Sequence, residues 1–251
     1  MGKNKLKKFA EMDTMQCVYQ FPYQTLAEGA CPLRGHWREL AFHNDRPLVL
    51  ELGCGKGEYA VGLGQRFPEC NYVGIDVKGA RMWTGAKQVT EMGLPNVAFL
   101  RTDIDLLDRL FAPDEVDELW ITFADPQMKK VNKRLTGTRM LNGYRRVLRD
   151  GGLVNLKTDS PFLYTYTREM ARLNNLPVLI DTDDLYRDGD SLDLPDGLLD
   201  IKTYYERQWL ARGLTIKYLR LALPHRGDLA EPDIDIPLDT YRSFHRNQPS
   251  L

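Results

Sequence analysis

Seven short apolar runs, separated by segments long enough to form helices, mark the chain from Pro47 onward. The first run, Leu48–Leu52, ends at Gly53 and is typical of a strand buried on both faces. The other runs are Asn71–Val77, Val97–Leu100, Glu118–Phe123, Gly152–Lys157, Val178–Ile180 and Ile216–Leu223. Strands that alternate with helices predict an α/β fold with a doubly wound, mostly parallel, seven-stranded sheet.

The clearest helix signal follows the fifth run. Ser160 is suited to cap a helix and Pro161 to its first position, and apolar side chains continue at helical spacing to about Asn174. The first 46 residues show no period for a long helix. The pattern therefore predicts an N-terminal extension with a basic start (1–46), one α/β domain (47–224) and an irregular C-terminal tail (225–251).

Composition excludes several classes of protein. The 251 residues are 43% hydrophobic, enough for a sizeable core, and their formal net charge of -1 argues against a protein held on nucleic acid by bulk positive charge. Four cysteines without a CxxC pair and four histidines without an HxxxH pair predict no metal site. No run approaches the roughly 18 apolar residues of a membrane span, so we expect a soluble, cytoplasmic protein.

A glycine-rich turn follows the first strand. Glu51 to Gly57 (ELGCGKG) lies where the strand meets the next helix, whose N-terminus presents free N–H donors to a ligand. The dinucleotide fingerprint requires a glycine at position 58, where Glu58 stands, which disfavours NAD. A tight turn that binds nothing is the alternative.

Carboxylates surround this turn. Asp76 ends the second strand, 23 positions after Gly53, where a carboxylate can accept both hydroxyls of a ribose. Asp103 follows the third strand and can accept from an adenine amino group, or instead cap a helix. Together with Glu51 these groups would repel a polyphosphate and attract a sulfonium and an ammonium group. The predicted ligand is S-adenosylmethionine, bound at the loop that contains Gly53 and Gly55.

A basic segment follows the fourth strand. It contains eight basic residues and no acidic ones: Lys129, Lys130, Lys133, Arg134, Arg139, Arg145, Arg146 and Arg149. A block of one sign beside a strand end indicates an anionic partner such as a phosphate backbone, with a solvated surface run as the alternative. Asp125 precedes this segment and is the candidate catalytic residue, since strand ends offer side chains to a substrate. A turn-forming Asp-Pro is the other interpretation.

Taken together, these motifs resemble the tRNA (guanine-N7)-methyltransferase family, of the bacterial type in which catalysis needs no second protein. The matching segments are LELGCGKG, YVGID, FADPQMKKVNKR, Lys157-Thr158-Asp159 and Thr203-Tyr204-Tyr205-Glu206, so the likeness runs from about Leu48 to Leu223. Five positions depart from the family pattern: Asp76, Ala124, Gln127, Asn132 and Leu135.

The resemblance implies a Rossmann-like class I fold and transfer of a methyl group from S-adenosylmethionine to N7 of a guanine in the variable loop of tRNA. It implies that the cofactor is contacted by Glu51, Asp76, Asp103 and Asp125, and the tRNA substrate by Lys129, Asp159, Thr203, Tyr204, Tyr205 and Glu206. We expect the side chains of Lys130, Lys133 and Arg134 to contact the phosphate backbone of the tRNA. Two alternatives stay open: a methyltransferase for another RNA or a small molecule, and a noncatalytic RNA-binding module with a relic cofactor pocket.

Overall fold

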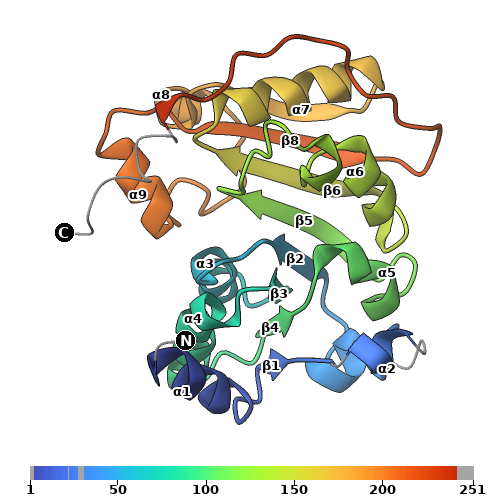
Figure 1. The fold of residues 1–251 in the computed structure, drawn as a ribbon, viewed down its shortest axis with the longest axis vertical. Coiled ribbons are helices and arrows are strands. Elements are labelled where there is room, and N and C mark those ends of the chain that lie inside the picture. The colour runs from blue at the N-terminus through green and yellow to red at the C-terminus, as the bar shows by residue number, and fades with distance from the viewer. Residues whose placement is uncertain (1–2, 22, 28–30, 242–251) are drawn as a thin grey trace.

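An eight-stranded sheet runs through the part of the chain that the computed structural model describes, residues 3–21, 23–27 and 31–241 (Figure 1). The strands are β1 (Val18–Tyr19), β2 (Leu48–Leu52), β3 (Asn71–Asp76), β4 (Val97–Arg101), β5 (Val116–Thr122), β6 (Leu148–Thr158), β7 (Val178–Thr182) and β8 (Lys217–Leu223). Their order is β1-β4-β3-β2-β5-β6-β8-β7. All neighbours are parallel except for β8, which pairs antiparallel with both β6 and β7.

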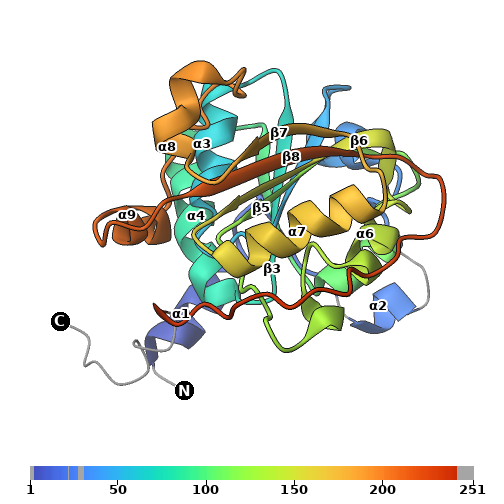
Figure 2. The same cartoon turned by 90° about the horizontal axis from the view of Figure 1, so that it is seen from above.

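Helices cover both faces of this sheet (Figure 2). They are α1 (Lys3–Met12), α2 (Tyr23–Ala27), α3 (Glu58–Arg66), α4 (Gly79–Met92), α5 (Leu107–Leu110), α6 (Thr138–Tyr144), α7 (Pro161–Leu173), α8 (Leu185–Asp188) and α9 (Tyr204–Leu210). Single turns of other helix types are η1 (Trp37–Ala41), η2 (Ile104–Leu106), η3 (Val131–Lys133) and η4 (Gly189–Ser191). None of the described helices is long and apolar enough to cross a membrane.

The alternation of side chains along β2 divides the core into two layers. Leu48, Leu50 and Leu52 pack with α5, α6 and α7, whereas Val49 packs with α3 and α4 on the opposite face. All five residues of β2 are buried, as the continuous apolar run predicts. The seven predicted strands are therefore confirmed, as is the helix capped by Ser160, whose Oγ accepts from the Leu163 N–H at 2.9 Å.

The N-terminal segment departs from the prediction. It adds β1 as an eighth strand beside β4, and α1 packs on α4, where the Trp83 indole N–H donates to Glu11 at 2.7 Å. Trp37 is fully buried between Tyr19 and Phe111. The extension therefore contains the short helix α1, and its apolar side chains complete the core, a long-range effect that no local period reveals.

The C-terminal tail has no helix or strand between Pro224 and residue 240, as expected, but it follows a fixed path along α7 (Figure 2). Arg145 donates to the Gly227 carbonyl at 2.7 Å, Tyr166 donates to Glu231 at 2.6 Å, and Asp239 is buried. We call residues 224–241 the C-terminal strap. Residues 242–251 of the predicted tail lie outside the described residues.

Candidate active site

The order of the strands places the candidate site. The chain winds from β2 through β3 to β4 in one direction and then returns to β5 on the other side of β2. Such a reversal leaves a crevice at the carboxyl ends of the two central strands, where doubly wound proteins bind their ligands. The glycine turn follows β2 at this place, and Asp125 follows β5.

Close packing accounts for Gly57, the last glycine of the turn. Gly57 has a left-handed φ of 71°, and a Cβ at this position would lie 2.3 Å from the ring of Phe99. Phe99 of β4 also meets Gly74 and Gly85, where an added Cβ would lie 2.7 and 2.6 Å from the same ring. The buried Phe99 ring thus packs directly on the backbone of β3, of α4 and of the residue before α3. Glycine at these three positions allows this close approach, which fixes the conformation of the turn.

Asp76 connects β3 to the turn. Its Oδ2 accepts from the Gly55 N–H at 2.9 Å and its Oδ1 from the Lys78 N–H at 2.8 Å. A carboxylate has about four acceptor positions, so two stay available for the hydroxyls of a ribose. The half-buried side chain therefore combines a structural role in the turn with acceptor capacity toward the pocket.

Glu51 is the innermost carboxylate. Its Oε2 accepts from the Ala60 N–H at the start of α3, and its Oε1 accepts from the Thr122 hydroxyl at 2.8 Å. Burial raises the pKa of this carboxyl to about 7, although both hydrogen bonds favour the ionised form. A cation near Glu51 would recover part of the cost of burying its charge.

Asp125 lies in an unusual loop. Phe123 and Gln127, on either side of it, have left-handed φ values of 51° and 47°, which is rare for residues with a side chain and is found often at functional sites. Asp125 Oδ1 accepts from the Gln127 N–H at 3.0 Å, and its Oδ2 has no hydrogen-bond partner within the described chain. The exposed carboxylate therefore keeps acceptor capacity at the pocket.

These groups line one cavity of about 480 Å³, within the range of small-molecule sites. The predicted residues that line it are Glu51, Gly53, Gly55, Asp76, Asp125, Lys133, Thr203 and Tyr205. The exposed rim of the cavity carries basic side chains, those of Lys78, Arg81 and Lys133. The carboxylates of Glu51 and Asp76 are less exposed and lie deeper. An inner wall of carboxylates fits the sulfonium and ammonium of S-adenosylmethionine, and a basic rim fits a phosphate backbone.

Asp103 lies apart from this cavity. It lines a neighbouring hollow with Gln20 and Val77, and its Oδ1 accepts from the Asp105 N–H at 3.1 Å as the cap of η2. The capping alternative is therefore confirmed, and an adenine contact by Asp103 stays a prediction.

Thr203 and Glu206 form the start of α9. The Thr203 hydroxyl accepts from the Glu206 N–H and the Glu206 carboxylate accepts from the Thr203 N–H, a reciprocal capping box. Glu206 is 0% exposed and pairs with Lys157 of β6 at 2.8 Å, also 0% exposed. In this structure Glu206 therefore fixes α9 to the sheet, and a tRNA contact by Glu206 stays a prediction.

Aromatic side chains extend from α9 toward solvent. Tyr204 and Tyr205 are 43% and 39% exposed and lie edge to face at 5.6 Å, with Lys56 Nζ 4.0 Å from the centre of the Tyr204 ring. Tyr205 and Trp209 both line the cavity. Trp209 is a lining residue that the sequence motifs did not mark. Its spacing of four residues from Tyr205, which places both on one face of a helix, is the signal that could have identified it.

The basic segment divides into exposed and engaged side chains. Lys129, Lys130 and Lys133 are exposed and make no ion pair with any described residue. Arg134 is 2% exposed, donates to the carbonyls of residues 126–128 and stacks on Tyr166 at 3.9 Å. The Arg134 guanidinium therefore holds the loop after Asp125 in this structure, and its contact with the tRNA backbone stays a prediction.

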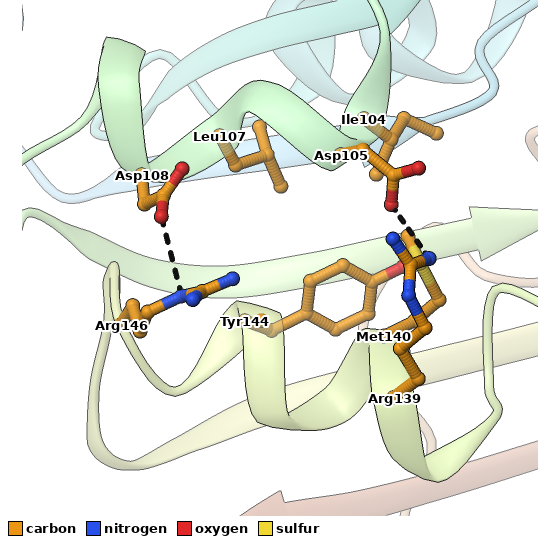
Figure 3. Close-up of a pocket in the computed structure, with 9 residues that line it drawn as sticks. Ile104, Asp105, Leu107, Asp108, Arg139, Met140, Tyr144 and Arg146 are labelled. Atoms are coloured by element: carbon orange, nitrogen blue, oxygen red, sulfur yellow. Dashed lines mark hydrogen bonds and ion pairs between the residues drawn. The ribbon is translucent and has the colours of Figure 1, made fainter. Parts of the chain in front are cut away.

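Arg139 and Arg146 of the segment also form ion pairs (Figure 3). Arg139 pairs with Asp105 at 2.9 Å and Arg146 with Asp108 at 3.4 Å, on either side of Tyr144. The cavity between them holds about 60 Å³, room for a few water molecules rather than a cofactor. The sequence count of eight positive charges thus overstates the charge that this segment presents to a ligand.

Comparison with solved structures defines the class of fold. A 16S rRNA methyltransferase, KamB, superposes with a TM-score of 0.55 at 16% identity, over 74% of this chain and 92% of that one. An antibiotic-related methyltransferase gives a TM-score of 0.52 at 16% identity, over 83% and 96% of the two chains. The sheet is therefore the Rossmann-like sheet of class I methyltransferases.

Sequence comparison narrows the class to a family. Residues 45–219 match the family model described as "Putative methyltransferase". A tRNA (guanine-N(7)-)-methyltransferase of Porphyromonas gingivalis is 59% identical over 242 residues, covering 95% of this chain and 98% of that protein. One of Bacteroides fragilis is 53% identical over 250 residues, covering 100% and 98%. The chain belongs to the tRNA (guanine-N7)-methyltransferase family.

Proposed function

We propose that this protein transfers the methyl group of S-adenosylmethionine to N7 of a guanine in the variable loop of tRNA, in the cytoplasm. The observation that carries the proposal is the cavity in which Glu51, Asp76 and Asp125 meet below a basic rim. In that site, Asp76 would hold the ribose and Glu51 would face the charged end of the cofactor. The activity of the close relatives supports the same reaction.

The reaction needs little acid–base chemistry from the protein. When bound, S-adenosylmethionine supplies an electrophilic methyl group, and guanine N7 offers a lone pair without a proton to lose. The side chains therefore have to align N7 with the methyl group and exclude water. Asp125, with one oxygen accepting from the Gln127 N–H, would stabilise the positive charge that the product base acquires.

The substrate side of the proposed site lies between α9 and the loop after β5. Tyr205 offers an exposed ring on which an unstacked base can pack, and Lys129, Lys130 and Lys133 offer charge to the backbone. Extraction of the guanine from the folded tRNA costs a few kcal/mol, which these contacts must supply.

Methylation of unmodified tRNA tests the proposal. The pure protein is incubated with labelled S-adenosylmethionine and tRNA, and the nucleosides are identified by mass spectrometry; we expect the label in 7-methylguanosine. Asp125→Asn is expected to abolish most of the transfer, whereas Asp193→Asn, at an exposed loop position, serves as the matched control. Label in another nucleoside would refute the guanine assignment, and binding of tRNA without label would favour a noncatalytic module.

A further inference from the structure

The end of the C-terminal strap covers a residue of the proposed substrate side. Asp159 follows β6 and is only 1% exposed. The Tyr241 hydroxyl donates to Asp159 Oδ2 at 2.6 Å, and the Tyr241 ring lies edge to face on Trp209 with the centres 5.4 Å apart. Trp209 in turn lines the cofactor cavity. The strap therefore brings a tyrosine from the far end of the chain to Asp159 and to Trp209, a residue in the wall of the cavity.

A buried aspartate fixes the strap two residues before this tyrosine. Asp239 Oδ2 accepts from the Ser160 hydroxyl at 2.5 Å, and Oδ1 accepts from the Phe162 N–H at 3.1 Å, at the N-terminus of the 13-residue helix α7. The Asp239 N–H also contacts Met128 Sδ at 3.2 Å, in the loop that follows Asp125. This anchor holds the strap independently of Tyr241, so the tyrosine can leave while Asp239 stays.

Tyr241 presents the chemistry that a guanine would present at the same place. A guanine has N–H donors on its Watson–Crick edge and a flat aromatic face, and a tyrosine has an O–H donor on an aromatic ring. The Asp159 carboxylate, which accepts from the tyrosine hydroxyl, can equally accept from a guanine N–H. The Trp209 indole, which packs on the tyrosine ring, can equally pack on a guanine. Lys217, opposite Thr158 in the β6–β8 pairing, supplies positive charge near Asp159 whichever donor is bound.

We propose that Tyr241 occupies the guanine position in the RNA-free protein and that tRNA binding exchanges the tyrosine for the substrate base. The inference rests on the proposed function, because it takes Asp159 as the acceptor of the guanine edge. Exchange avoids leaving a carboxylate buried without a donor, which is costly.

Tyr241→Phe tests the exchange, since it removes the hydroxyl and keeps the ring. Without its hydrogen bond to the charged Asp159 acceptor, the side chain at position 241 is held less tightly and competes less with the guanine. The KM for tRNA should therefore fall about tenfold at unchanged kcat. Tyr164→Phe is the matched control, because the Tyr164 hydroxyl donates to a different carboxylate, Asp181 of β7, at 2.5 Å, and its loss should leave KM unchanged. If Tyr241 instead orients Asp159 for catalysis, the variant raises KM or lowers kcat, and the inference is overturned.

A second measurement does not depend on turnover. Fluorotyrosine placed at position 241 is followed by ¹⁹F NMR during titration with unmodified tRNA, with fluorotyrosine at position 164 as the reference. We expect the signal from 241 to move toward that of a solvent-exposed tyrosine and the signal from 164 to stay. An unmoved signal with tRNA bound and methylated would overturn the exchange alone, whereas failure of the native protein to methylate tRNA would refute the proposed function.

Discussion

The buried pair of Lys157 and Glu206 makes a quantitative prediction. Lys157→Met removes the positive partner and leaves the buried Glu206 carboxylate with two neutral donors, the Tyr186 hydroxyl at 2.6 Å and the Thr203 N–H at 3.3 Å. Breaking a fully buried ion pair by removing one partner costs about 3–5 kcal/mol. For a chain of this length, 1 kcal/mol lowers the melting temperature by about 2–4 °C, so we expect a drop of about 10 °C.

A double-mutant cycle separates the ion pair from the other losses. Lys157 also donates to the carbonyls of Leu198 and Ile201, and these bonds are lost in every variant that lacks the lysine. Glu206→Gln removes the charge and keeps an acceptor for Tyr186. We therefore expect the double variant to be more stable than the sum of the single costs predicts, by about 2 kcal/mol or more, the size of coupling found between contacting residues.

The assay is urea unfolding followed by fluorescence, with Arg66→Met as the control. Arg66 pairs with Asp200 at 2.7 Å in the same region, but both side chains are about half exposed, so this variant should cost about 0–1 kcal/mol. Additive costs of the two single variants, or a loss below about 1 kcal/mol for Lys157→Met, would refute the argument that this pair fixes α9 to the sheet.

Three further predictions concern charges at the site. Burial raises the pKa of Glu51 to about 7, and a cationic ligand favours the ionised form of this carboxyl. Calorimetry should therefore show that S-adenosylmethionine binds more tightly as the pH rises through about 7, and Glu51→Gln should flatten this pH profile. An unchanged profile in the variant would contradict the role of Glu51. The same raised pKa means that the ligand-free fold loses stability as the pH rises from about 4.5 toward 7, which thermal unfolding of the native protein and the Gln variant should show as a pH-dependent difference in melting temperature. Combined substitution of Lys129, Lys130 and Lys133 by Ala should reduce the slope of log K for tRNA against log salt by about 2. Arg134→Met should lower the melting temperature without changing that slope, because Arg134 is buried and donates to the Pro126 carbonyl. An equal effect of both variants on the slope would contradict the distinction between exposed lysines that bind tRNA and an arginine that holds the loop.

Local sequence signals predicted most of the sheet and half of the site. Strands such as β2 are marked by continuous apolar runs, and α7 is marked by Ser160 and Pro161 at its start, because these preferences act between near neighbours. The positions of Asp76 and Asp125 followed from strand ends alone, since parallel strands bring their carboxyl ends to one edge.

The remaining features depend on contacts between distant segments. A count of charges cannot tell that Arg134 is buried beneath Pro126 and Tyr166 while Lys133 beside it is exposed. Nor can the motif around Glu206 reveal that its carboxylate pairs with Lys157, 49 positions earlier. Long-range pairs of this kind are set by tertiary packing, which overrides the local pattern.

The two-residue strand β1 has a consequence for how the protein avoids aggregation. Without it, β4 would end the sheet as an open edge of unpaired N–H and C=O groups, a template for another chain to add a strand. Val18 and Tyr19 cover the Phe99–Leu100 part of that edge, and a strand so short offers little for a second molecule to extend. Removal of the first 21 residues should therefore expose the edge of β4 and allow a strand of another molecule to pair with it, which promotes aggregation.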